Sequence, residues 1–155
     1  KGQMEHFQPQ PEPLEVSKLF DDIALYFGGE QVVFHFENPS NLTLITDENY
    51  LKTILRNLTS NAIKALQNTT IPSAAEGKII RWRAWQEDNH TYLAITDNGS
   101  GSTHEKFKAL YDDKEVVGIK TGLGMHLIRD LAKAINCTID VDSELGKGTT
   151  ITLRL

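Results

Sequence analysis

The chain has 155 residues, of which 39% are hydrophobic and 24% charged, and its formal net charge is −5. These values are typical of one globular domain and exclude a disordered chain. The negative charge argues against a general nucleic-acid or anionic-membrane binder, because both need a basic surface. The single cysteine, Cys137, excludes an internal disulfide. No apolar run approaches the ~20 residues that span a bilayer.

The first half of the chain predicts a linker, two helices and two strands. Residues 1–13 are polar and contain three prolines, so we interpret them as a linker and residues 14–155 as the domain. Helical spacing of apolar residues predicts a helix from Ser17, its candidate N-cap, to a stop at Gly28. Strands are expected at 31–36 and 42–45. A long helix is expected over 48–67, capped by Asp47.

The second half predicts four strands and one helix. Strands are expected at 79–85 and 91–96, separated by the polar turn 87–89. Residues 97–124 are punctuated by glycine, and a helix is expected over 123–135. The last strands should span 138–141 and 149–155. Helices and strands alternate irregularly, which predicts an α/β or α+β fold with a mixed sheet.

The long helix carries a polar stripe. Asn57, Asn61 and Lys64 follow one another at i, i+4 and i+7, so they share one side of the helix. A solvated surface is the ordinary explanation. The functional alternative is that an asparagine oxygen binds Mg²⁺ and the lysine neutralises phosphate.

Three glycine-containing motifs follow. Asp97 opens the run 97–101 at a strand end, where its carboxylate could form a turn or accept a hydrogen bond from the amine of adenine. The run 118–124 leads into a helix, whose N-terminal N–H groups attract anions. The run 146–150 contains Thr149 and Thr150 in a hairpin and could place a hydroxyl beside a base.

The order of these motifs resembles the catalytic domain of sensor histidine kinases. The runs 57–64, 97–101, 121–125 and 146–150 are similar to the family's N box, its two glycine boxes and its final glycine/threonine box. The resemblance covers about residues 14–155. It implies the two-layer α/β sandwich of the Bergerat ATP-binding fold, with about three helices on one face of a mixed sheet, as in gyrase, chaperone and mismatch-repair ATPases.

The resemblance also implies roles for individual residues. Asn61 would coordinate Mg²⁺ with help from Asn57, Lys64 would meet phosphate, and Asp97 would recognise adenine. These first three would be the catalytic side chains. The nucleotide-binding set would be Asn61, Lys64, Asp97, Gly99, Gly101, Thr121, Gly122, Leu123, Gly124 and Thr149 or Thr150.

Three departures from the family pattern stand out. Ala65 follows the lysine of the N box where an aromatic residue is common. Phe107 and Tyr111 replace the usual paired phenylalanines, and only about twenty residues separate Gly101 from Thr121. A smaller lid and weaker nucleotide retention are therefore expected.

Asn57 separates a kinase from a dedicated ATPase. Hydrolytic relatives have a glutamate at this position as general base, and a neutral amide cannot take that role. The expected function is binding of Mg-ATP and transfer of its γ-phosphoryl group to histidine in two-component signalling. An anti-sigma-type serine kinase and a non-catalytic nucleotide-binding module remain the alternatives.

The expected partners follow from the same resemblance. None of the five histidines has the His-Glu/Asp helical context of an acceptor, so the linker should join a missing dimerisation and phosphoacceptor domain. A response regulator is the expected protein partner. The fragment is expected to be a monomeric cytoplasmic domain without nucleic-acid or membrane contact, and its parent a homodimer that could be anchored in the inner membrane.

Overall fold

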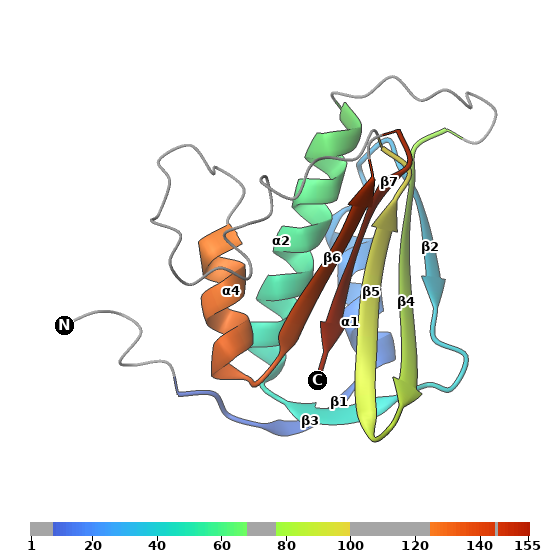
Figure 1. The fold of residues 1–155 in the computed structure, drawn as a ribbon. Helices are drawn as coiled ribbons and strands as arrows, with labels where there is room; N and C mark the ends of the chain where they lie inside the picture. The colour runs from blue at the N-terminus through green and yellow to red at the C-terminus, as the bar shows by residue number, and fades with distance from the viewer. Residues whose placement is uncertain (1–7, 68–76, 100–124, 145) are drawn as a thin grey trace.

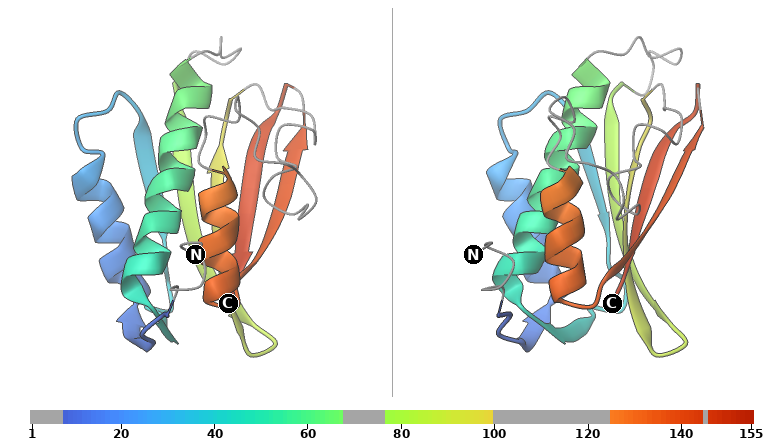
Figure 2. Two further views of the ribbon diagram at one scale, coloured as in Figure 1. Left: turned by 90° about the vertical axis from the view of Figure 1, so that its left-hand side faces the viewer. Right: turned by 60° about the vertical axis from the view of Figure 1, so that its left-hand side comes forward.

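The computed structural model describes residues 8–67, 77–99, 125–144 and 146–155. Within these residues, a five-stranded sheet forms one layer, and three helices cover one of its faces (Figure 1, Figure 2). The described elements are β1 (Glu12–Glu15), α1 (Val16–Tyr26), β2 (Val33–Glu37), β3 (Thr43–Thr46), α2 (Glu48–Gln67), β4 (Ile79–Glu87), β5 (His90–Asp97), α4 (Met125–Ala134), β6 (Thr138–Glu144) and β7 (Gly148–Arg154).

The sheet is mixed, as the sequence predicted. Its strand order is β2-β4-β5-β7-β6, in which β2 pairs parallel with β4 and the other pairs are antiparallel. The hairpin between β4 and β5 turns through Asp88 and Asn89, whose φ angles are 51° and 66°. Two consecutive positive φ angles match the twist of a two-residue hairpin. Both strands therefore extend further than predicted, to the pair Glu87 and His90.

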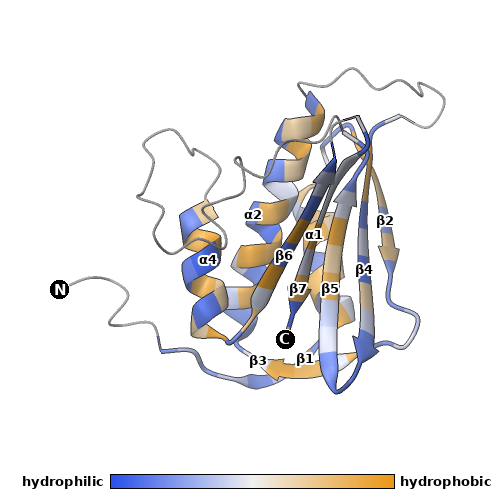
Figure 3. Ribbon diagram, viewed as in Figure 1, coloured by the Kyte–Doolittle hydropathy of each residue, from blue (hydrophilic) through white to orange (hydrophobic). Residues whose placement is uncertain are grey.

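The core lies between the sheet and the helices. Trp82 of β4 is fully buried on this side, and its Nε1 donates to Thr59 Oγ1 of α2 at 3.0 Å. Thr59 Oγ1 in turn donates to the Leu55 carbonyl oxygen at 2.8 Å. The indole N–H and the hydroxyl are thus both satisfied, so neither group adds an unpaired polar atom to the core. Figure 3 shows the apolar and polar segments along α2 and α4.

Helix α1 begins one residue before the predicted cap. Glu15 occupies the N-cap position and makes no side-chain capping bond, so Ser17 is not the cap. Val16 N–H instead donates to the Leu42 carbonyl oxygen at 2.9 Å. A contact with a segment 26 residues away therefore fixes the start of the helix, and local sequence carries no signal for it.

Strand β1 overlaps the end of the predicted linker. Glu12 and Pro13 belong to β1, which pairs antiparallel with β3 in a separate two-stranded sheet. Proline is compatible with a strand at a sheet edge, where its missing N–H is not needed. Two residues of the predicted linker are thus paired in a strand, and the boundary between linker and domain stays a prediction.

Candidate functional site

Helix α2 has the predicted bounds, and Asp47 caps it, since Asp47 Oδ1 accepts a hydrogen bond from Tyr50 N–H at 3.0 Å. Asn57 and Asn61 are half-buried and Lys64 is exposed. Asn57 Nδ2 donates to the Thr53 carbonyl oxygen at 2.8 Å, which fixes the orientation of its amide. The stripe is therefore partly shielded at its first two residues and open at its last.

An ion pair holds α2 against α1 on the flank away from the stripe. Arg56 donates from Nε and Nη2 to the two carboxylate oxygens of Asp22 at 2.9 and 2.7 Å. Its guanidinium also lies over the Tyr26 ring, 4.2 Å from the centroid. The bidentate hydrogen bonds with Arg56 lower the pKa of the Asp22 carboxyl. This geometry restricts rotation of α2 about its own axis.

Asp97 ends β5 at the same end of the molecule as the C-terminal half of α2 (Figure 1). Its side chain is 7% exposed, and Oδ1 accepts a hydrogen bond from Gly99 N–H at 2.9 Å. The predicted turn is therefore present. The same hydrogen bond fixes which way the buried carboxylate points, so the turn and a base-recognition role are compatible.

Asn98 stabilises this turn, a role that was not predicted from the sequence. Its Oδ1 accepts from Ile79 N–H, and its Nδ2 donates to the Gly77 carbonyl oxygen, both at 2.8 Å. The side chain thereby joins the end of β5 to the start of β4. Asparagine beside glycine signals a turn but not its distant partners, so the sequence could not have revealed this connection.

Strand register separates the two candidate threonines. Thr149 lies directly opposite Asp97, and its Oγ1 is 2.7 Å from Ser143 Oγ. Thr150 lies opposite Thr96, and their hydroxyl oxygens are 3.0 Å apart. Directly paired residues share a face of the sheet and neighbouring residues do not. Thr149 is thus on the face of Asp97, while Thr150 is on the opposite face and away from it.

Gly148 allows β7 to pass close to Asp97. Its φ is +105°, and a Cβ at this position would overlap the Asp97 carbonyl oxygen. Any larger residue would therefore displace either the strand or the end of β5. From the sequence alone, this glycine was predicted only as part of a hairpin motif.

Several predicted site residues fall outside the described residues. These are Gly101, Thr121, Gly122, Leu123 and Gly124 of the glycine boxes. The unusual pair Phe107 and Tyr111 also falls there. Their roles stay predictions.

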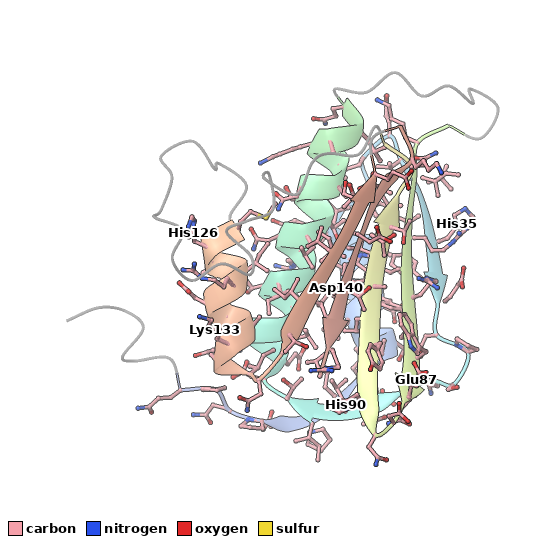
Figure 4. All side chains as sticks on the ribbon, viewed as in Figure 1. His35, Glu87, His90, His126, Lys133 and Asp140 are labelled. Atoms are coloured by element: carbon pink, nitrogen blue, oxygen red, sulfur yellow. The ribbon has the colours of Figure 1, made fainter. Side chains whose placement is uncertain are left out.

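The described histidines lie apart from one another. Figure 4 shows His35 on β2, His90 at the β4–β5 hairpin and His126 at the start of α4. Cys137 is buried, and burial raises the pKa of its thiol to about 12, so it has no thiolate character near neutral pH. Among the described residues, no three His, Cys, Asp or Glu side chains cluster as metal ligands.

A cavity of about 260 Å³ lies beside the C-terminal end of α2, mainly on the side away from Asn61. Gly29 to Val32, the end of α2 and Lys78 line it. Of its α2 residues, Ile63 and Leu66 lie about 160° and 140° around the helix from Asn61 at ~100° per residue, whereas Gln67 lies about 60° from Lys64. Most of the cavity and Asn61 are therefore on different sides of α2.

Comparison with known proteins decides the family. The family model described as histidine kinase-, DNA gyrase B- and HSP90-like ATPase matches residues 46–155. The chain belongs to this family. Within the family, it is an ATP-binding domain of the type found in sensor histidine kinases, as predicted.

None of the helices in the described part of the chain is long and apolar enough to cross a membrane.

Two relatives of this ATPase-family chain are named as sensor proteins. It is 30% identical over 130 residues to the sensor protein CiaH of Streptococcus pneumoniae, covering 79% of this chain and 28% of that one. It is 33% identical over 120 residues to the aerobic respiration control sensor protein ArcB of Escherichia coli, covering 72% and 14%. The chain thus spans less than a third of the length of these relatives.

Solved structures agree on the fold. The catalytic domain of histidine kinase ThkA, in a nucleotide-free form, superposes with a TM-score of 0.74 at 17% identity, covering 94% of this chain and 95% of that one. The histidine kinase AdeS of Acinetobacter baumannii gives a TM-score of 0.73 at 18% identity, covering 98% and 71%. The predicted α/β sandwich with a mixed sheet is confirmed.

Proposed function

We propose that this domain binds Mg-ATP between the polar stripe of α2 and the Asp97 end of β5, and that its parent protein transfers the γ-phosphoryl group to a histidine. The observation that carries the proposal is the buried Asp97 carboxylate, oriented by Gly99 N–H and flanked by Thr149 on the same face. A buried carboxylate at the same end of the molecule as a polar stripe that is open at Lys64 suits a ligand with a hydrogen-bond donor at one end and phosphates at the other.

The residues present fit the two expected ligands. Asp97 and Thr149 would hold the adenine base, because a carboxylate accepts a hydrogen bond from an exocyclic amine and a hydroxyl can donate or accept one. Asn57 and Asn61 would supply neutral oxygens to Mg²⁺, which also needs phosphate oxygens and water. When bound, Mg²⁺ would neutralise phosphate charge. Lys64 would add a flexible positive charge on the same side of α2.

Transfer is favoured over hydrolysis by the chemistry of position 57. The amide of Asn57 already donates to the Thr53 carbonyl oxygen, and it is not basic enough to activate water. The contribution of this chain would then be positioning and charge neutralisation. The acceptor histidine, a response regulator as partner and dimerisation would belong to the parent. The serine kinase and the non-catalytic module are the alternatives.

The adenine role predicts a change of base preference in Asp97→Asn. Gly99 N–H requires an oxygen at the Oδ1 position, so the new amide nitrogen would replace Oδ2 and face the base as a donor. ATP affinity should fall about tenfold or more, while GTP affinity should fall less or rise. Calorimetry with both nucleotides measures this. Asp140→Asn, an exposed carboxylate on β6, is the control. Equal losses for both nucleotides contradict the assignment.

The metal role predicts that Asn61→Ala removes the Mg²⁺ dependence of nucleotide binding. An alanine has no oxygen to offer the ion, so titrations with and without Mg²⁺ should give similar dissociation constants. An unchanged magnesium response in the variant contradicts the role.

In the parent, acid-labile phosphohistidine after incubation with ATP supports the kinase. Acid-stable phosphoserine on a partner supports the serine kinase, and no transfer supports the non-catalytic module.

A further inference from the structure

The carboxylate of Asp47 joins two segments that are far apart in sequence. Asp47 lies between β3 and α2 and is 6% exposed. Its Oδ1 accepts from Tyr50 N–H in the first turn of α2, at 3.0 Å. Its Oδ2 accepts from Gln10 N–H at 2.7 Å, across 37 residues of sequence. One oxygen thus bonds the helix. The other bonds residues 8–11, the described residues before β1, which we call the entering segment.

In the described part of the chain, the entering segment is attached to this corner of the fold and to no strand of the five-stranded sheet. β1 pairs only with β3, in the register Glu12 to Thr46, so the contact with Asp47 lies directly beside this ladder. Figure 1 shows β1 and β3 beneath the lower end of α2. Gln10, two residues before β1, is therefore tied through Asp47 to the N-terminus of α2.

Helix α2 connects this corner to the candidate nucleotide site. It is one uninterrupted helix of 20 residues without glycine or proline. Asn57 and Asn61 follow Asp47 by ten and fourteen residues, which places them about 15 and 21 Å along the axis. Because α2 has no proline or glycine at which a helix would kink, a shift of its first turn would be carried along it to the polar stripe.

We propose that Asp47 is a positioning residue that couples the entering segment to the Mg-nucleotide site through α2. The proposal rests on the proposed function. The hydrogen bond between Gln10 and Asp47 favours one placement of α2, the placement that binds nucleotide. Because coupling between two sites is reciprocal, bound nucleotide also strengthens the attachment of the entering segment.

Gln10→Pro tests the coupling without touching Asp47 or the site. Proline removes the backbone N–H that donates to Oδ2, whereas Gln10→Ala keeps it and is the matched control. Gln10→Pro should weaken binding of a non-hydrolysable ATP analogue with Mg²⁺ by about fivefold. Gln10→Ala should bind like the original chain. Amide hydrogen exchange should accelerate in the first turn of α2 in the proline variant only.

A second variant separates the two oxygens. Asp47→Asn keeps an oxygen for Tyr50 N–H, since asparagine is a good N-cap, and turns an amide nitrogen towards Gln10 N–H. The analogue should slow exchange of the Gln10 amide in the original chain and have no such effect in this variant. If the contact were purely structural, Gln10→Pro and Asp47→Asn would both lower the midpoint of unfolding. The dissociation constant of the ATP analogue would then stay unchanged.

The outcomes are distinct. Equal affinities of Gln10→Pro and Gln10→Ala, or exchange at Gln10 that ignores the nucleotide in the original chain, overturn the coupling while leaving the proposed function intact. An original chain that binds no nucleotide overturns the proposed function, and the coupling with it. Weaker binding in Gln10→Pro together with reciprocal protection of Gln10 supports the coupling.

Discussion

Single residues decide which side chains can meet at the candidate site. The sequence predicted Asp97 and a threonine of the final motif, but it could not choose between Thr149 and Thr150. Their separation depends on the pairing of β5 with β7, which puts Thr149 opposite Asp97. A shift of one residue would exchange the two faces, and no local signal in the hairpin sequence fixes that register.

Gly148 gives a testable prediction at this scale. In Gly148→Ala the new Cβ would overlap the Asp97 carbonyl oxygen, in addition to strain from a φ of +105°. We expect a loss of about 2–4 kcal/mol in the free energy of unfolding and weaker ATP binding. Chemical denaturation and calorimetry measure the two effects.

Gly146→Ala is the matched control for that change. Gly146 also has a positive φ, +85°, but nothing lies within 4 Å of its would-be Cβ. Gly146→Ala should lower the free energy of unfolding by only about 1–2 kcal/mol, because of backbone strain, and should retain its ATP affinity. Equal effects of the two alanines would show that the close approach to Asp97 is unimportant.

Elements were predicted best where their signals are local. The bounds of α2 were correct because Asp47 caps it and apolar residues recur along its buried side. Strand β6 was predicted too short, since its last three residues, Asp142 to Glu144, are polar. They continue the strand by pairing with β7 at the edge of the sheet, which is a contact between distant residues. Edge strands tolerate such polar residues.

The contact between α1 and α2 predicts a dependence of stability on pH. The lowered pKa of Asp22 means that its carboxylate stabilises the fold above the unfolded pKa, near pH ~4, and that this stabilisation is lost as pH falls through the folded value. The Arg56 and Asp22 side chains are 36% and 19% exposed, so solvent screening limits the contribution to about 1 kcal/mol.

Asp22→Asn should therefore lower the free energy of unfolding at about pH 7 and have little effect at about pH 2. Urea denaturation at both pH values measures it. Glu144→Gln breaks the exposed pair with Lys147, whose side chains are 66% and 72% exposed, and should change little at either pH. A loss in Asp22→Asn that is the same at both pH values would contradict an ionic contribution.

The whole molecule explains why a few motifs were enough to predict the fold. Three of the four runs placed the long helix, the end of a central strand and the final hairpin, and the fold brings the C-terminal half of α2, the end of β5 and the β6–β7 hairpin to one end (Figure 2). What the motifs left open are the contacts that join distant segments, such as those of Asn98 with Gly77 and Ile79. Such contacts depend on how the layers pack rather than on local residue patterns.

The central claim is that α2, the end of β5 and the start of β7 converge on one bound nucleotide. Amide hydrogen exchange on adding Mg²⁺ and a non-hydrolysable ATP analogue tests it most directly. Residues 57–64 of α2, Gly99 and Thr149 should gain protection together, at one saturating concentration, and the gain should depend on Mg²⁺. Protection confined to Gly29–Val32 and Lys78 around the cavity beside the C-terminal end of α2, or no protection at all, would contradict the account.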